Sequence, residues 1–383
     1  MTRTPEYDAR VRAWADALRS GDTRTWAEFR ESDAASPGHG PLPGNAQLEL
    51  VRRLAERDVP GDFGALADLV LATPSPGRGL VDPPLPWPGG LREFGTPAVE
   101  PDQQPVEELV RAACGVLVKL LRAQPETRRR VRRPVPRRRA FVLAGAPVTV
   151  AAVRETLRSA GLREGGRRAT YLVLGGPFDH LMAERWCARI AAGEATRWRR
   201  SWRAAKTRPR GWPDLDLPTL ASSYAEKAPG RVHVVLGTDP QQVADRALGL
   251  LGVRARVRVG SADIVAADLL RRLNPLLVLA AGPAGARALV TGPWADAVDA
   301  RPHEGSLGAP SGHGAWSKAT ATRMAEELAA AARAGDYAVH GDPAVLLGDR
   351  RAGTGAVVRR AVPAEDVLDL ALDLIASLWE GAH

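Results

Sequence analysis

The sequence has almost no cysteine and no long apolar run. Cys114 and Cys187 are its two cysteines among 383 residues, too few for a disulfide framework or, by themselves, for a zinc site. No segment approaches the ~20 consecutive apolar residues that a membrane-spanning helix needs. The first residues are charged and lack the apolar core of a signal peptide. These absences predict a cytoplasmic protein that does not cross a membrane.

Several motifs of familiar catalytic and binding sites are also absent. The sequence has no G-x-S-x-G nucleophile elbow, no Walker A loop and no G-x-G-x-x-G dinucleotide fingerprint. His303, Glu304 and His313 lie in a glycine-rich segment, at separations that suit neither a compact metal motif nor a pair on one helix. We therefore expect no metal site, and these signatures identify no enzyme class.

What the sequence has in excess is positive charge. Lysine and arginine number 53 against 44 aspartate and glutamate residues, which gives a net charge of +9. Such a balance is typical of proteins that bind nucleic acids or other anions. Arginine far outnumbers lysine, however, and alanine, glycine and proline are frequent, as in chains encoded by GC-rich genomes. Codon bias explains part of the charge without any nucleic acid, and both interpretations stay open.

Composition and periodicity divide the chain into two domains. Residues 1–124 contain several segments with apolar residues at helical spacing and predict a smaller, mostly helical domain. Residues 125–139 are rich in arginine and proline, a composition that predicts an exposed linker. Residues 140–383 combine short apolar runs with helical segments and predict an α/β domain.

The second domain begins with a repeated strand-then-helix pattern. Short apolar runs ending in glycine at 139–145, 170–176 and 231–237 predict strands, and a shorter run at 256–260 predicts a fourth. A helical segment follows each of the first three. Such units predict a parallel sheet covered by helices, with the ligand-binding loops gathered at the carboxyl ends of the strands.

Three blocks in the second domain follow the order and spacing of a known family. They are RVHVVLGTDPQQVADRALGLLGV at 231–253, SADIVAADLLRRLN at 261–274 and WSKATATRMAEELAAAARAGDYAVHGDPAVLL at 316–347. On these blocks the segment from about Arg139 to Asp349 resembles actinobacterial sulfotransferase-like proteins, a branch of the P-loop-related transferases. The resemblance implies a parallel-sheet P-loop/sulfotransferase-like domain and adenylyl phosphosulfate as the sulfuryl donor.

The resemblance also implies two anion-binding features for this donor, and the sequence departs from both. In the family, a Pro-Lys-Ser/Thr-Gly-Thr-Thr loop opening a helix holds the 5′-phosphosulfate, and an arginine after a later strand holds the 3′-phosphate. Gly145 and Pro147 match the first loop, but Val148 stands at the lysine position and only Thr149 offers a hydroxyl. Gly176 stands at the arginine position. We expect the donor site to be lost, with Gly145, Thr149 and Gly176 as its remnants.

These departures favour a pseudoenzyme, scaffold or accessory protein over an ordinary sulfotransferase. The expected partner is then an anionic small molecule or another protein, with no certain cofactor. Arg350 and Arg351, in a glycine-rich segment, loosely resemble the Arg-Lys-Gly-x-x-Gly donor-binding segment of another sulfotransferase branch. They indicate an alternative, an active transferase with an altered donor site. A surface turn with solvated arginines is the simpler interpretation.

His180 and Glu184 are the candidate catalytic residues if the protein is an enzyme. They follow the second predicted strand and lie four residues apart, so they share one face of a helix. A histidine and a carboxylate so placed can act as an acid–base pair at the ligand-binding edge. A hydrogen bond on the helix surface is the simpler alternative.

Basic and aromatic residues are mixed in RWRRSWRAAKTRPRGW at 197–212. Such a segment, together with the arginine-rich linker, can bind nucleic acid by stacking bases and neutralising phosphates. The alternative is a helix with Trp198 and Trp202 on its buried face and arginines outside. We favour the packed helix, so nucleic acid stays a partner that the sequence permits without favouring it.

Overall fold

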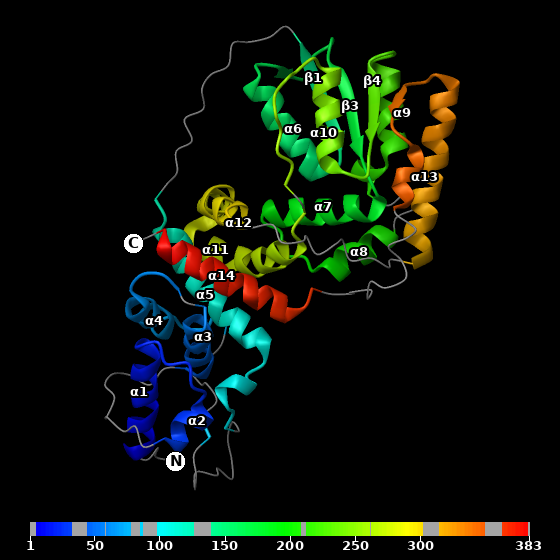
Figure 1. Cartoon of the computed structure of the whole chain (residues 1–383). Helices are drawn as coiled ribbons and strands as arrows, with labels where there is room; N and C mark the ends of the chain where they lie inside the picture. Colours follow the sequence, from blue (N-terminus) through cyan, green and yellow to red (C-terminus); the bar gives the residue numbers. More distant parts are fainter. Residues whose placement is uncertain are drawn as a thin grey trace. The chain divides into compact units, whose positions relative to one another are not determined.

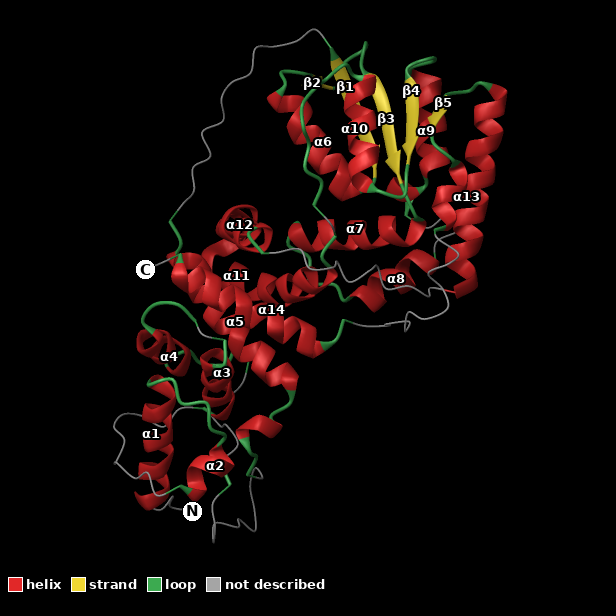
Figure 2. Ribbon diagram, viewed as in Figure 1, coloured by secondary structure: helices red, strands yellow, loops and turns green. Residues whose placement is uncertain are grey.

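The computed structural model describes residues 5–32, 44–57, 59–77, 85–86, 98–125, 139–207, 212–260, 262–301, 314–348 and 362–381 (Figures 1 and 2). Contacts divide the chain into two units. Unit 1 comprises Met1–Thr127, Leu269–Arg301 and Pro363–His383, and unit 2 comprises Arg128–Asp268 and Pro302–Val362. Each unit is described by itself.

Unit 1 is helical. Its elements are α1 (Pro5–Arg19), α2 (Trp26–Glu31), α3 (Asn45–Ala55), α4 (Phe63–Leu71), η1 (Pro101–Gln103), α5 (Val106–Ala123), most of α11 (Ile264–Leu289), η3 (Val290–Trp294), α12 (Ala295–Asp299) and α14 (Ala364–Glu380). The core lies between α5 and α14, whose apolar residues recur at helical spacing. Leu117 and Leu121 of α5 and Leu374 and Ile375 of α14 are fully buried.

The units differ from the predicted division into residues 1–124 and 140–383. Helix α14 and the segment 269–301 belong to unit 1, although both lie far along the chain from the N-terminal helices. The reason is the apolar face of α14, which buries Leu368, Leu372 and Trp379 among others and packs on α5. Segments that complete a core from a distance leave no local signal in the sequence.

Unit 2 contains a sheet of five strands, all parallel, so the predicted α/β class with a parallel sheet is confirmed. The spatial order is β2-β1-β3-β4-β5, one of the common orders of doubly wound sheets. Three of the strands occur where the sequence predicts them. The strands are β1 (Ala140–Gly145), β2 (Arg163–Glu164), β3 (Thr170–Gly175), β4 (Val232–Leu236) and β5 (Ala338–His340).

Helices cover both faces of this sheet and its carboxyl edge. Helices α6 and α10 contact each other on one face, and α9 packs against β3 and β4 on the other (Figure 1). Helix α7 does not lie along a face but runs across the carboxyl ends of the strands (Figure 2). The helical elements are α6 (Pro147–Ser159), α7 (Phe178–Ala191), α8 (Trp198–Lys206), η2 (Pro213–Leu215), α9 (Leu217–Lys227), α10 (Pro240–Leu250), α13 (Gly314–Ala334) and η4 (Pro343–Leu347).

The strand predicted at 256–260 does not form. Its backbone is bound instead by the side-chain amide of Gln241 in α10, which donates to Val257 O at 2.9 Å and accepts from Val259 N at 3.2 Å. One amide side chain therefore replaces the ladder bonds that a neighbouring strand would supply. The position at the far edge of the sheet is taken by β5.

No helix in the described ranges is both long enough and apolar enough to cross a membrane.

Candidate functional site

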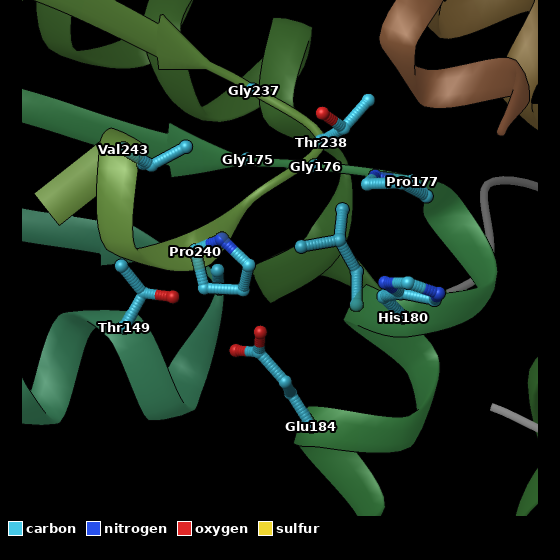
Figure 3. A pocket seen from close by; sticks show the side chains of 12 residues that line it. Thr149, Gly175, Gly176, Pro177, His180, Glu184, Gly237, Thr238, Pro240 and Val243 are labelled. Carbon is cyan, nitrogen blue, oxygen red and sulfur yellow. The ribbon is translucent and has the colours of Figure 1, made fainter. Parts of the chain in front are cut away.

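A pocket in unit 2 lies where the carboxyl ends of β1, β3 and β4 meet the helices that follow them (Figure 3). In this strand order the chain leaves β1 toward one edge of the sheet and leaves β3 toward the other, and ligands bind at such a switch point. The pocket is narrow, and its enclosed space is about that of one water molecule. It is lined by Ala146, Thr149, Gly175, Gly176, Pro177, His180, Leu181, Glu184, Gly237, Thr238, Pro240 and Val243.

Gly145 does not line this pocket, but it allows the backbone turn beside it. Its φ is +99°, a conformation that side chains other than glycine rarely adopt. A Cβ atom at this position would lie 2.0 Å from the carbonyl oxygen of Leu174, and the next residue, Ala146, donates its N–H to that same oxygen at 2.8 Å. The glycine lets β1 turn sharply into α6 while remaining paired with β3.

Gly176 lines the pocket, and its surroundings leave little room for a side chain. A Cβ atom there would lie 3.0 Å from the carbonyl oxygen of Gly237, at the end of the neighbouring strand. The preceding Gly175 is closer still to its neighbours, since a Cβ atom would lie 2.4 Å from the side chain of Leu217. An arginine, which the resemblance places at 176, would have to push these strand ends apart.

Glu184 is the central polar residue of the pocket. It projects from α7 toward the first turn of α6, and its Oε2 accepts a hydrogen bond from Val148 N at 2.9 Å (Figure 3). The side chain is buried, with 5% of its surface exposed. Burial raises the pKa of Glu184 to about 7, and hydrogen bonds from the backbone N–H groups of Val148 and Thr149 offset part of that rise. The pocket therefore holds a carboxyl group that retains its proton to a higher pH than an exposed glutamate does.

This arrangement makes Glu184 the cap of α6. Ala146 stands at the N-cap position and offers no side-chain hydrogen bond, and Pro147 opens the helix without an N–H group. The free N–H groups of a first helical turn attract an anion, commonly a phosphate in α/β proteins. Here the carboxylate of Glu184 takes that place. The sequence signal was the missing cap residue before Pro147, which indicates a partner from elsewhere without saying which.

Thr149 is brought to the same place with its hydroxyl unsatisfied. The residue is 1% exposed, and its Oγ1 has no hydrogen-bond partner among the described residues. Figure 3 shows this oxygen directed toward the space between Pro240 and Glu184. The one hydroxyl that survives from the predicted loop therefore faces the pocket without binding any described protein group.

His180 and Glu184 both line the pocket, as their spacing predicts, but the hydrogen bonds of Glu184 go to α6 and not to His180. His180 lies at the open side of the pocket. Loss of water around its ring lowers the pKa of His180, and the carboxylate of Asp179 opposes this by a smaller amount. Asp179 itself accepts a hydrogen bond from Ser317 Oγ at 2.6 Å. An acid–base role for the pair stays a prediction.

Among the described residues that line the pocket there is neither lysine nor arginine. Arg350 and Arg351 lie outside the described residues, so their compensating role stays a prediction. His303, Glu304 and His313 also lie outside the described residues, so the expectation that they form no metal site stays a prediction. Within the described part of the chain, no group of three or more histidine, cysteine, aspartate or glutamate side chains could hold a metal ion.

Comparison with known proteins finds no matching family model, no matching curated protein and no matching solved structure. The interpretation of the pocket therefore depends on its own geometry and charge.

Proposed function

We propose that unit 2 is a sulfotransferase-like domain without a working donor site, and that the protein acts as a pseudoenzyme in a scaffolding or accessory role. The observation that carries this proposal is the hydrogen bond between Glu184 and the N-terminus of α6. That position is where the family resemblance places the phosphosulfate of the donor. An internal carboxylate that binds the helix N-terminus makes an external anion unnecessary for the fold.

The residues of the pocket do not fit adenylyl phosphosulfate. Its 5′-phosphosulfate would have to displace the carboxyl group of Glu184, which already accepts a hydrogen bond from Val148 N, and the ionised form of that group would repel the anion. Val148 stands where the resemblance places the lysine that would neutralise the anion, and no lysine or arginine occurs among the described residues of the pocket lining. Pre-placed positive charge is usually the largest contribution to a transfer step of this kind. We therefore derive no sulfuryl transfer for this chain.

The test uses adenosine 3′,5′-bisphosphate and inorganic sulfate as probes in thermal denaturation of the whole protein. We expect neither probe to raise the unfolding temperature of the wild-type protein. A ligand present at ~100 times its dissociation constant would stabilise the fold by about 2.7 kcal/mol, which this measurement detects easily. A clear rise with the bisphosphate in the wild-type protein would overturn the proposal.

Two variants connect the result to Glu184 itself. Glu184→Ala removes the carboxyl group and frees the N–H groups of α6, so sulfate should now stabilise the protein. Glu184→Gln keeps a side chain of the same size that still accepts from Val148 N, so sulfate should have no effect. If sulfate stabilises both variants equally, or neither, occupation of the helix N-terminus by Glu184 is not what excludes anions.

A further inference from the structure

Helix α8 presents an exposed face made of cations. Trp198 and Ala205 are buried on its inner side, whereas five basic residues within ten positions are exposed. None of the five forms an ion pair or a side-chain hydrogen bond with another residue in the described part of the chain. They are Arg197, Arg199, Arg200, Arg203 and Lys206.

The neighbouring acids are already engaged. Glu194, four residues before the helix, pairs with Arg189 at 2.6 Å, and Asp214, in η2, pairs with Arg185 at 3.0 Å. The helix itself contains no acidic residue in its first turn. Arginines near a helix N-terminus also oppose the helix dipole. The face therefore carries a positive charge that no described residue of the protein compensates.

Aromatic contacts anchor the inner side of helix α8. The ring of Trp198 packs edge-on against Trp186 at 5.6 Å between centroids, and Trp202 packs against Trp316 at 5.1 Å. Trp186 is in turn fixed by a hydrogen bond from its Nε1 to the carbonyl oxygen of Thr196. As the sequence predicts, Trp198 is buried and the arginines lie outside, whereas Trp202 is only half-buried.

Three of the cations lie along one line of the helix. Arg199, Arg203 and Lys206 are spaced i, i+4 and i+7, so they share a face and span about 10 Å along the helix axis. This length equals the rise of about three nucleotides along one strand of a duplex. Arginine also binds phosphate oxygens with two parallel N–H groups, which gives this row a geometry suited to a phosphate backbone.

We propose that the exposed face of α8 binds the phosphate backbone of nucleic acid without reading its sequence. The burial of Trp198 and the contacts of Trp202 remove the two rings that could stack on bases. A membrane surface is the weaker fit, because an interfacial helix needs exposed apolar side chains, whereas the half-buried Trp202 packs on Trp198 and Trp316. This site lies on α8 and is independent of the pocket at Glu184.

The experiment measures binding of the whole protein to a fluorescent 20-base-pair duplex by anisotropy at several salt concentrations. The test variant combines Arg199→Gln, Arg203→Gln and Lys206→Gln. The slope of log K against log salt is negative, and each lost phosphate contact makes it shallower by about 0.9. The triple variant should therefore show a slope that is shallower by about 2.7. Its affinity at ~100 mM salt should fall at least ~10-fold. Two unrelated duplex sequences should bind the wild-type protein within about 3-fold of each other.

A matched control removes the same charge elsewhere in unit 2. Arg254, Arg256 and Arg258 are also exposed, but they lie in an irregular segment and not on a helix. Their triple glutamine variant should bind the duplex within about 2-fold of the wild-type protein. An equal loss in both triple variants would mean that net charge alone attracts the duplex, and the assignment to α8 would fail.

Three further outcomes overturn the proposal. The first is no binding of the duplex by the wild-type protein at ~50 mM salt. The second is binding of polyglutamate as tight as that of the duplex, which would identify an acidic protein as the partner. The third is binding of vesicles with anionic lipid that is tighter than binding of the duplex. All six substituted residues are exposed, and matching thermal unfolding of each variant and the wild type checks that the fold is intact.

Discussion

Glu184→Gln is expected to change the pH dependence of stability by up to about 3 kcal/mol. Burial raises the pKa of Glu184 from its usual 4.5 to about 7 in the folded protein. The folded state therefore holds this proton to a higher pH than the unfolded chain does, and raising the pH favours unfolding. The stability that the protonated group contributes is complete below about pH 4.5 and is lost as the pH rises through about 7. Glutamine does not titrate, so the variant keeps that stability.

The measurement is urea unfolding of wild type and variant, followed by tryptophan fluorescence at pH values from 4.5 to 8.5. Subtracting the two curves of unfolding free energy against pH cancels the contributions of the other titrating groups. These include His180, the other ionisable residue of the described pocket lining. The difference in unfolding free energy should grow with pH and level off above about pH 8. Parallel curves would contradict the assignment of a buried, proton-retaining carboxyl group at this position.

Gly145→Ala is expected to destabilise the protein by more than about 3 kcal/mol. Two costs combine at this residue. Its φ of +99° strains any other amino acid, and the new Cβ atom would lie 2.0 Å from the carbonyl oxygen of Leu174. Relief of that contact requires β1 and β3 to separate where Ala146 N binds the same oxygen. Chemical unfolding at neutral pH measures the loss.

Gly193→Ala is the control for the backbone strain alone. Gly193 follows α7 with a φ of +102°, nearly that of Gly145, but a Cβ atom there would meet no other atom within 4 Å. This variant should lose only about 1 kcal/mol, as is usual for a glycine that ends a helix. Equal losses in the two variants would show that the close approach to Leu174 costs nothing.

Local patterns predicted the framework of unit 2 well. The runs at 139–145, 170–176 and 231–237 became β1, β3 and β4, because β-branched and apolar residues bounded by glycine suit buried parallel strands. The pattern failed at 256–260, which has the same residue types. The side chain of Gln241 satisfies that backbone, and nothing in the segment itself indicates this.

The sequence likewise predicted some features of the candidate site and missed others. Glycine at 145 and valine at 148 are properties of the sequence, and they flank the turn from β1 into α6. The spacing of His180 and Glu184 also places both at the pocket. The contact between Glu184 and Val148 N joins residues 36 positions apart in the chain. It exists because α7 runs across the carboxyl edge of the sheet, an orientation that helical periodicity does not determine (Figure 2).

The sequence by itself therefore determined three of the parallel strands, the helices that follow them and the inward position of Trp198. Each depends on neighbours in the chain, through alternation, helical spacing or residue type. Only the tertiary structure decided that α14 completes unit 1, that β5 occupies the edge of the sheet and that Glu184 caps α6. Those outcomes depend on how distant apolar surfaces pack, and packing brings together groups that no local pattern relates.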